Sequence, residues 1–207
     1  MSLSSASDIE QALQRLGDLL QFRRQRFAIA IVGGAALNLL HVVARTTSDV
    51  DILAFADPAE LVQGGAGALT EAPSPLPTEL MRAATEVARE LGLDPGWLNN
   101  GPTLQMRSGL PPGMASRFAW RQFGSLWVGV AARQDLIALK LFAAVDRSGP
   151  QGVDTMDLLA LAPTPAELAW AVAWVATQDA SPAFASTLEK VQQYVLHTLS
   201  LGAQDDA

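Results

Sequence analysis

The sequence of 207 residues contains no cysteine, only two histidines and a single tyrosine. The absence of cysteine excludes disulfide bonds, thiolate metal sites and a cysteine nucleophile. His41 and His197 are too few and too far apart in the sequence to indicate a zinc site. There is no apolar run long enough to span a bilayer, and the N-terminal segment lacks the basic start and apolar core of a signal peptide. We therefore expect a cytoplasmic protein with no membrane partner.

Charged residues are also scarce, at 17% of the chain, whereas hydrophobic residues make up 49%. This balance is typical of a globular protein that buries a full hydrophobic core. The net charge of −7 argues against tight non-specific DNA binding, which requires a broad cationic face. No acidic residue occurs between Asp94 and Asp135, and that interval contains four arginines, Arg107, Arg117, Arg121 and Arg133.

The periodicity of apolar residues predicts strands and helices in alternation, followed by a helical C-terminal part. Strands are predicted at 27–32, 49–55 and 126–131. Helices are predicted at 7–25, where Ser7 and Glu10 have capping-box spacing, and at 35–43, 78–91 and 135–145. Residues 56–76, rich in Gly, Ala and Pro, are predicted to form a loop. Beyond Gly149-Pro150 the chain is expected to be all helical, with Thr164-Pro165-Ala166-Glu167 opening one helix and Ser181-Pro182 the last.

Two short segments carry the predicted chemistry. Asp49 and Asp51 lie two positions apart at the start of a strand, so their side chains point to the same side and can converge on Mg²⁺. Gly33 and Gly34 end the preceding strand and open a helix, where glycine allows the backbone to approach a triphosphate closely. If the two strands are neighbours, one segment binds phosphate and the other binds metal.

These motifs resemble those of the nucleotidyltransferase superfamily related to DNA polymerase β. In that superfamily a strand ends in Gly-Gly or Gly-Ser, and a later strand bears Asp-x-Asp. The segment from Arg45 to Asp51 is similar to the bacterial branch that contains the AbiEii-type toxins and related uncharacterised proteins. Further matches to this branch occur downstream, at Trp97-Leu98-Asn99, Lys140-Leu141, Arg147 and Asp154-Thr155-Met156-Asp157-Leu158. The resemblance covers about residues 27 to 161.

The resemblance implies an α/β (α+β) fold with a small mixed sheet flanked by helices over residues 1–150. Residues 151–207 would form a C-terminal helical part packed on this core. It implies a magnesium-dependent enzyme in which Asp49 and Asp51 are catalytic residues and metal ligands. Nucleotide-binding residues would be Gly33, Gly34, Arg45, Thr47 and Lys140. The donor would be a nucleoside triphosphate and the acceptor an RNA end or a protein hydroxyl, as in toxin–antitoxin systems.

One departure from the family pattern concerns a third carboxylate. Active members place it on a later core strand, but the predicted strand at 126–131 has none. The alternative is therefore a catalytically inactive protein of the same fold that acts as a regulatory module by binding a nucleotide or a partner. A third possibility is a structural partner protein that forms a homodimer through its apolar C-terminal helices.

Several residues also have simpler interpretations. Lys140 lies in an apolar helix and could extend its amine to the surface rather than to a nucleotide. Asp154 and Asp157 have the spacing of a helix N-cap and its third residue, and Arg147 could pair with them. The arginines between Asp94 and Asp135, interleaved with Trp and Phe, could bind single-stranded nucleic acid. We favour a structural role, in which the aromatic residues form core and the arginines cover acidic parts of the molecule.

Overall fold

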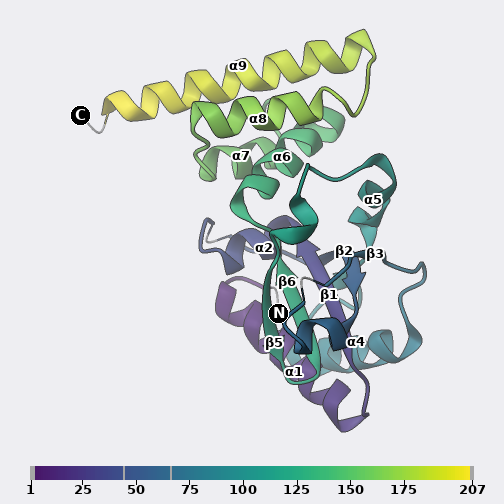
Figure 1. Ribbon diagram of the computed structural model, residues 1–207. Coiled ribbons are helices and arrows are strands. Elements are labelled where there is room, and N and C mark those ends of the chain that lie inside the picture. The colour runs from purple at the N-terminus through teal and green to yellow at the C-terminus, as the bar shows by residue number, and fades with distance from the viewer. Residues whose placement is uncertain (1–2, 44, 66, 206–207) are drawn as a thin grey trace. The chain divides into compact units, whose positions relative to one another are not determined.

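The computed structural model describes residues 3–43, 45–65 and 67–205, and the chain divides into two compact units. The N-terminal unit spans Met1–Ala132 and the C-terminal unit spans Arg133–Ala207. The division lies directly after the last strand, whereas the sequence placed it at residue 150. The fold is of the mixed α/β type that the sequence predicts, with an open mixed sheet and flanking helices (Figure 1).

The N-terminal unit contains the sheet and the helices around it. Its elements in chain order are α1 (Ala6–Phe22), β1 (Phe27–Val32), α2 (Gly33–Leu39), β2 (Val50–Ala56), α3 (Pro58–Val62), β3 (Thr70–Glu71), α4 (Thr78–Leu91), β4 (Leu98–Asn99), η1 (Gly101–Leu104), α5 (Gln105–Ser108), η2 (Met114–Ser116), β5 (Ala119–Phe123) and β6 (Leu126–Val130).

The sheet has the order β3-β2-β1-β6-β5, and β4 pairs with the start of β2. β1 lies in the middle, antiparallel to β2 and parallel to β6. Its residues Ala28 to Ile31 are fully buried, as expected for a central strand that is apolar along its whole length. The predicted strand at 27–32 is confirmed residue for residue. β5 and β6 form an antiparallel hairpin that completes the far edge.

Helix α1 packs on the β5–β6 hairpin through two glycines. A Cβ on Gly17 would overlap the carbonyl oxygen of Phe123, and a Cβ on Gly124 would lie 2.7 Å from the backbone of Gly17. Gly124 also has a left-handed φ of 53°. The helix begins at Ala6, one residue before the predicted start, because Ser5 rather than Ser7 is the N-cap and accepts a hydrogen bond from the Asp8 amide.

The segment predicted as a loop at 56–76 contains two short elements, so that prediction is wrong in part. Asp57 caps α3 by accepting from the Ala59 amide, with Pro58 in the first turn. β3 pairs with β2 at Ala54 and Phe55. Helix α4 follows and matches the predicted 78–91, ending at Gly92 with a left-handed φ of 66°.

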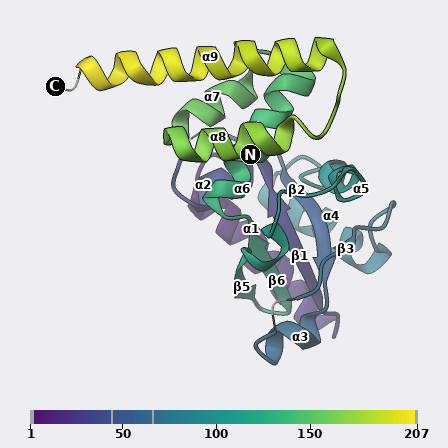
Figure 2. The ribbon, with the colours of Figure 1, turned by 45° about the horizontal axis from the view of Figure 1, so that its top comes forward.

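The described residues of the C-terminal unit form helices joined by turns and include no strand, as predicted beyond Pro150. It contains α6 (Arg133–Ala143), which continues into the π-helical turn η3 (Ala144–Ser148), then α7 (Val153–Ala160), α8 (Pro165–Val175) and α9 (Pro182–Asp205). Figure 1 shows α9 alongside α8 and Figure 2 shows it next to α7, in agreement with the contacts of α9 with both helices.

The predicted caps of α8 and α9 are both present. Thr164 and Glu167 form a complete capping box at the start of α8, and Ser181 accepts from the Phe184 amide at the start of α9. The residues Leu188, Val191 and Val195 are buried along α9. Over the described parts of the chain, none of the helices has both the length and the apolar character needed to cross a membrane.

Candidate functional site

The glycine pair lies where strand β1 turns into helix α2. The helix begins at Gly33 itself, two residues earlier than predicted, and ends at Leu39 rather than at Val43. Gly33 has a left-handed φ of 75°, a conformation that residues with a Cβ rarely adopt. A Cβ at this position would overlap Oδ2 of Asp51 and lie 3.2 Å from its Cγ. The Asp51 carboxylate therefore rests directly on the backbone of Gly33.

Asp49 and Asp51 stand at the start of β2, next to the glycine pair, as the sequence predicts. Asp51 is paired across the sheet with Val32, the residue before Gly33, because β1 and β2 are antiparallel neighbours. Both carboxylates are half-buried, whereas the alternating residues Val50 and Ile52 are fully buried in the core. The strand thus directs its carboxylates away from the core and towards the end of β1.

The second glycine is covered by the segment that leads into β2. A Cβ on Gly34 would lie 2.9 Å from Thr47 Oγ1 and 3.3 Å from Arg45 Nη2. The Thr47 hydroxyl is 3.3 Å from the Asp49 carbonyl oxygen and 3.4 Å from Asp49 Oδ1, and it can donate to either. Six of the seven predicted site residues, Gly33, Gly34, Arg45, Thr47, Asp49 and Asp51, are therefore neighbours within the N-terminal unit.

Two further residues that the sequence did not identify hold this segment in place. The Thr47 amide donates to the Leu3 carbonyl oxygen over 2.9 Å, and Leu3 is 1% exposed. Asn38 donates its side-chain amide to the carbonyl oxygens of Gly34 and Arg45. The sequence signal for Asn38 is a single amide inside an otherwise apolar helix, whereas nothing in the sequence indicates the contact of Leu3.

Lys140, the seventh predicted site residue, lies in α6 of the C-terminal unit and is 8% exposed. Its Nζ is 2.8 Å from Asp154 Oδ1 and 2.7 Å from Asp157 Oδ2. Both aspartates are buried in α7. The lysine therefore does not extend to the surface, and its amine forms a buried cluster with two carboxylates.

The cap role predicted for Asp154 and Asp157 is wrong. Helix α7 starts at Val153 with Gly152 as its N-cap, which moves both aspartates into the helix. There they face Lys140 rather than the helix end. The predicted pairing with Arg147 is present, since Arg147 Nη2 lies 3.6 Å from Asp154 Oδ2.

Among the described residues, no third carboxylate forms a metal-binding group with Asp49 and Asp51. Within the described residues, no group of three or more His, Cys, Asp or Glu side chains is arranged to hold a metal ion. The strand next to Asp51 on the side opposite β1 is β4, which places Asn99 in register with Asp51. Asn99 is half-buried, and its Oδ1 accepts from the Gly101 amide over 2.9 Å.

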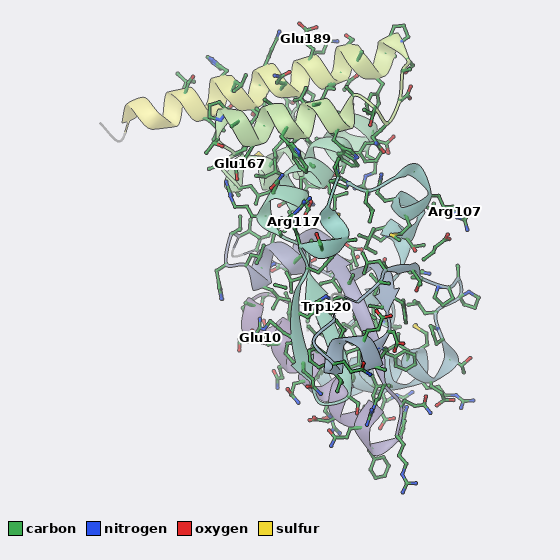
Figure 3. The ribbon with its side chains drawn as sticks, viewed as in Figure 1. Glu10, Arg107, Arg117, Trp120, Glu167 and Glu189 are labelled. Atoms are coloured by element: carbon green, nitrogen blue, oxygen red, sulfur yellow. The ribbon has the colours of Figure 1, made fainter. Side chains whose placement is uncertain are left out.

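The arginine-rich interval has the structural role that we favoured. Arg107 donates a bidentate pair of hydrogen bonds to the Glu71 carboxylate, and these bonds hold the pKa of the Glu71 carboxyl below its ordinary value. Arg121 pairs with Glu10, and Arg133 pairs with Glu167. Figure 3 shows Arg107 on α5, a different segment from that of Arg117 and Trp120 near the start of β5.

The aromatic residues of the same interval are buried in the core, as are Trp97, Phe118 and Phe123, or partly buried against it, as are Trp120 and Trp127. Trp97 is fully buried and donates its indole N–H to the Ala84 carbonyl oxygen. Trp120 lies flat on Gly129 of the neighbouring strand, where a Cβ would be 2.9 Å from the ring. Stacking of nucleic-acid bases requires exposed ring faces, which Trp97 does not offer and which Trp120 lacks on the side that Gly129 covers.

A separate groove of about 390 Å³ lies between α8 and α9. Its floor is apolar and includes Val172, Phe184 and Leu188, and its charged lining residues are Asp179 and Glu189. A negative lining repels phosphate, so this groove does not suit a nucleotide.

No family model, curated protein or solved structure matches this chain. The resemblance to nucleotidyltransferases therefore rests on the short motifs of the sequence.

Proposed function

We propose that this chain is a metal-dependent nucleotidyltransferase that moves a nucleotidyl group from a nucleoside triphosphate to a hydroxyl of RNA or protein. The observation that carries the proposal is the fit of the Asp51 carboxylate onto Gly33, where a side chain would overlap it. A glycine with a left-handed φ leaves room at the end of β1 for the Asp51 carboxylate, which any side chain at this position would overlap. It is useful where backbone, carboxylate and a bound phosphate must share a small space.

The donor set of the site fits Mg²⁺. Asp49 and Asp51 offer carboxylate oxygens from the start of one strand, and both are half-buried rather than sealed in the core. Magnesium is commonly bound through one or two carboxylates together with waters and substrate phosphates. When bound, the ion would neutralise negative charge on the triphosphate.

The neighbouring side chains support phosphate binding at the same place. Arg45 supplies a permanent cation and Thr47 a hydroxyl, and both lie against Gly34. A guanidinium recognises phosphate oxygens through two parallel N–H groups. Lys140 is a weaker part of the proposal, because its amine already pairs with Asp154 and Asp157.

The acceptor and the setting follow from the family resemblance alone. We infer an RNA end or a partner-protein hydroxyl as the acceptor, a cytoplasmic location and a place in a toxin–antitoxin system. A homodimer formed through the C-terminal helices belongs to the same set of inferences.

A second candidate function is favoured by one specific observation. Because no third carboxylate or histidine completes a metal group among the described residues, the chain could bind nucleotide without turnover. Such a protein would regulate through a nucleotide-bound state rather than through a product.

The test is to incubate the purified protein with Mg²⁺ and each labelled nucleoside triphosphate, with and without total RNA and cell lysate. Label transfer and pyrophosphate release that disappear in Asp49→Asn and Asp51→Asn are expected for the enzyme. Asp57→Asn is the matched control, because Asp57 lies at the other end of β2, is exposed and caps α3, a role that asparagine retains.

The outcomes separate the two candidates. Nucleotide-dependent thermal stabilisation without label transfer would favour the binder over the enzyme. Absence of any response to nucleotide or metal would overturn both.

A further inference from the structure

Asn38 is a buried amide that joins the two halves of the candidate site. It belongs to α2, is 1% exposed, and donates from Nδ2 to the Gly34 carbonyl oxygen over 3.0 Å and to the Arg45 carbonyl oxygen over 3.1 Å. The first partner is in the glycine pair and the second is in the segment that leads to Asp49. One amide group therefore ties these segments together.

The other atom of the same amide is unfavourably placed. Asn38 Oδ1 is buried and has no hydrogen-bond partner among the described residues. Rotating the amide would not help, because its oxygen would then face two carbonyl oxygens. An unpaired buried acceptor is destabilising, and an apolar side chain of the same size would avoid it. The benefit of an amide at position 38 therefore lies in the two hydrogen bonds that its N–H groups donate.

Those bonds control where the phosphate-binding side chains lie. The Arg45 guanidinium and the Thr47 hydroxyl both lie beside the Gly34 backbone, at 3.3 Å and 2.9 Å from the position of a Cβ. The Arg45 carbonyl that Asn38 holds is only two residues before Thr47. Releasing it would allow this segment to move away from the glycine pair.

We propose that Asn38 is a positioning residue that holds Arg45 and Thr47 against Gly34, so that they engage one phosphate group together. This inference rests on the proposed function, because it assumes that the site binds the polyphosphate of a nucleoside triphosphate. Asn38 itself touches backbone only and acts through Arg45 and Thr47.

The experiment measures binding of inorganic tripolyphosphate in the presence of Mg²⁺ by calorimetry, which avoids any dependence on the nucleotide base. Two variants remove the bridge. Asn38→Leu removes both bonds, whereas Asn38→Thr can still donate to the Gly34 carbonyl four residues earlier but is too short to reach Arg45. We expect both to weaken binding about tenfold, a difference of about 1.4 kcal/mol.

A double-mutant cycle with Arg45→Ala separates positioning from a general effect on stability. If Asn38 acts through Arg45 and Thr47, Asn38→Thr weakens binding less in the Arg45→Ala background, where only Thr47 remains to be positioned, than in the wild-type protein. Asn100→Leu is the matched control, since Asn100 also donates its amide to a backbone carbonyl, that of Pro73, outside the site. It should leave binding within twofold of wild type.

Two results would overturn the inference. If wild-type protein binds tripolyphosphate in a manner that depends on Asp49 and Asp51, but Asn38→Thr binds equally well, the inference alone fails. If wild-type protein does not bind tripolyphosphate at all, the proposed function and the inference fail together.

Discussion

Two pairs of closely spaced aspartates, Asp49 with Asp51 and Asp154 with Asp157, are held in different ways. Asp154 and Asp157 are buried in the C-terminal unit and share the amine of Lys140. Asp49 and Asp51 are half-buried in the N-terminal unit and lie against glycine backbone and a threonine hydroxyl. Two buried carboxylates that share an internal lysine depend on that lysine for their charge balance, whereas the carboxylates at the glycine turn are those that we propose bind a cation. Sequence spacing alone does not distinguish these two arrangements.

The largest effect should come from the lysine of the buried cluster. Lys140→Met leaves two buried carboxylates without their shared cation and should lower the free energy of unfolding by about 3–5 kcal/mol. Urea unfolding followed by circular dichroism measures this change. The chain has a natural control in its other lysine, Lys190, which is exposed on α9. Lys190→Met should change stability by no more than about 0.5 kcal/mol, and equal effects of the two variants would contradict a buried ion cluster.

The next effect tests whether backbone space holds Asp51. Gly33→Ala combines a left-handed φ with overlap against the Asp51 carboxylate and should destabilise by about 2–3 kcal/mol. Gly64→Ala is the matched control, because Gly64 has a φ of 78° but no atom within 4 Å of its Cβ position. It should lose only about 1 kcal/mol. Similar losses of stability in both variants would show that the left-handed backbone, and not overlap with the Asp51 carboxylate, requires glycine at position 33.

A smaller effect concerns the pH dependence of the C-terminal unit. The Thr164 amide, followed by Arg133 and the Thr164 hydroxyl, holds the pKa of the Glu167 carboxyl below its ordinary value of 4.5. A lowered pKa means that this stabilisation is complete above pH 4.5 and is lost as the pH falls through the folded-state value. Glu167→Gln should therefore lower stability at pH 7 by about 0.5–1 kcal/mol and make unfolding less sensitive to acid. Thermal unfolding between pH 7 and pH 3 measures both, and an unchanged acid slope would argue against the role of Glu167.

The smallest effect on stability should be that of Asp49→Asn. Asp49 is half-buried and its hydrogen bond from Thr47 is long, so the free energy of unfolding should change by about 0.5 kcal/mol or less. Asp154→Asn, by contrast, weakens the buried cluster and should cost about 1–3 kcal/mol. Parallel urea titrations compare the two, and the comparison between the aspartate pairs fails if Asp49→Asn is the more damaging change.

Local signals predicted part of this fold very well. The apolar run at 27–32 and the amphipathic period that ends at Gly92 gave β1 and α4 their observed bounds, because both segments have clear ends. The start of α1 was misplaced because Ser5 and Ser7 are both acceptable N-caps, and tertiary packing selects between them. The short β3 was missed because its stability comes from pairing with β2 and not from its own period, and the five-residue α3 is too short to show a period.

The candidate site was predicted to a similar extent. Six of its residues come together because β1 and β2 are antiparallel neighbours, and the short connection between them made this pairing the natural expectation. The role of Lys140 could not be predicted, because its partners Asp154 and Asp157 lie on another helix. The side of α7 on which these two carboxylates lie depends on where the helix begins, which is set by its N-cap at Gly152. Asn38 was overlooked because a single amide in an apolar helix does not reveal which carbonyl oxygens it contacts.

The position of β1 in the sheet has a consequence for the order in which the molecule assembles. Its first neighbour, β2, is close in the sequence, so a growing chain can pair the two strands and bring Gly33 to Asp51 early. Its second neighbour, β6, lies about a hundred residues later, as does the hairpin turn that contacts Gly17. Until residues 126–130 have been synthesised, one edge of an apolar strand stays open and prone to pairing with other chains. Nascent chains that stop before β6 are therefore the form of this protein most exposed to aggregation.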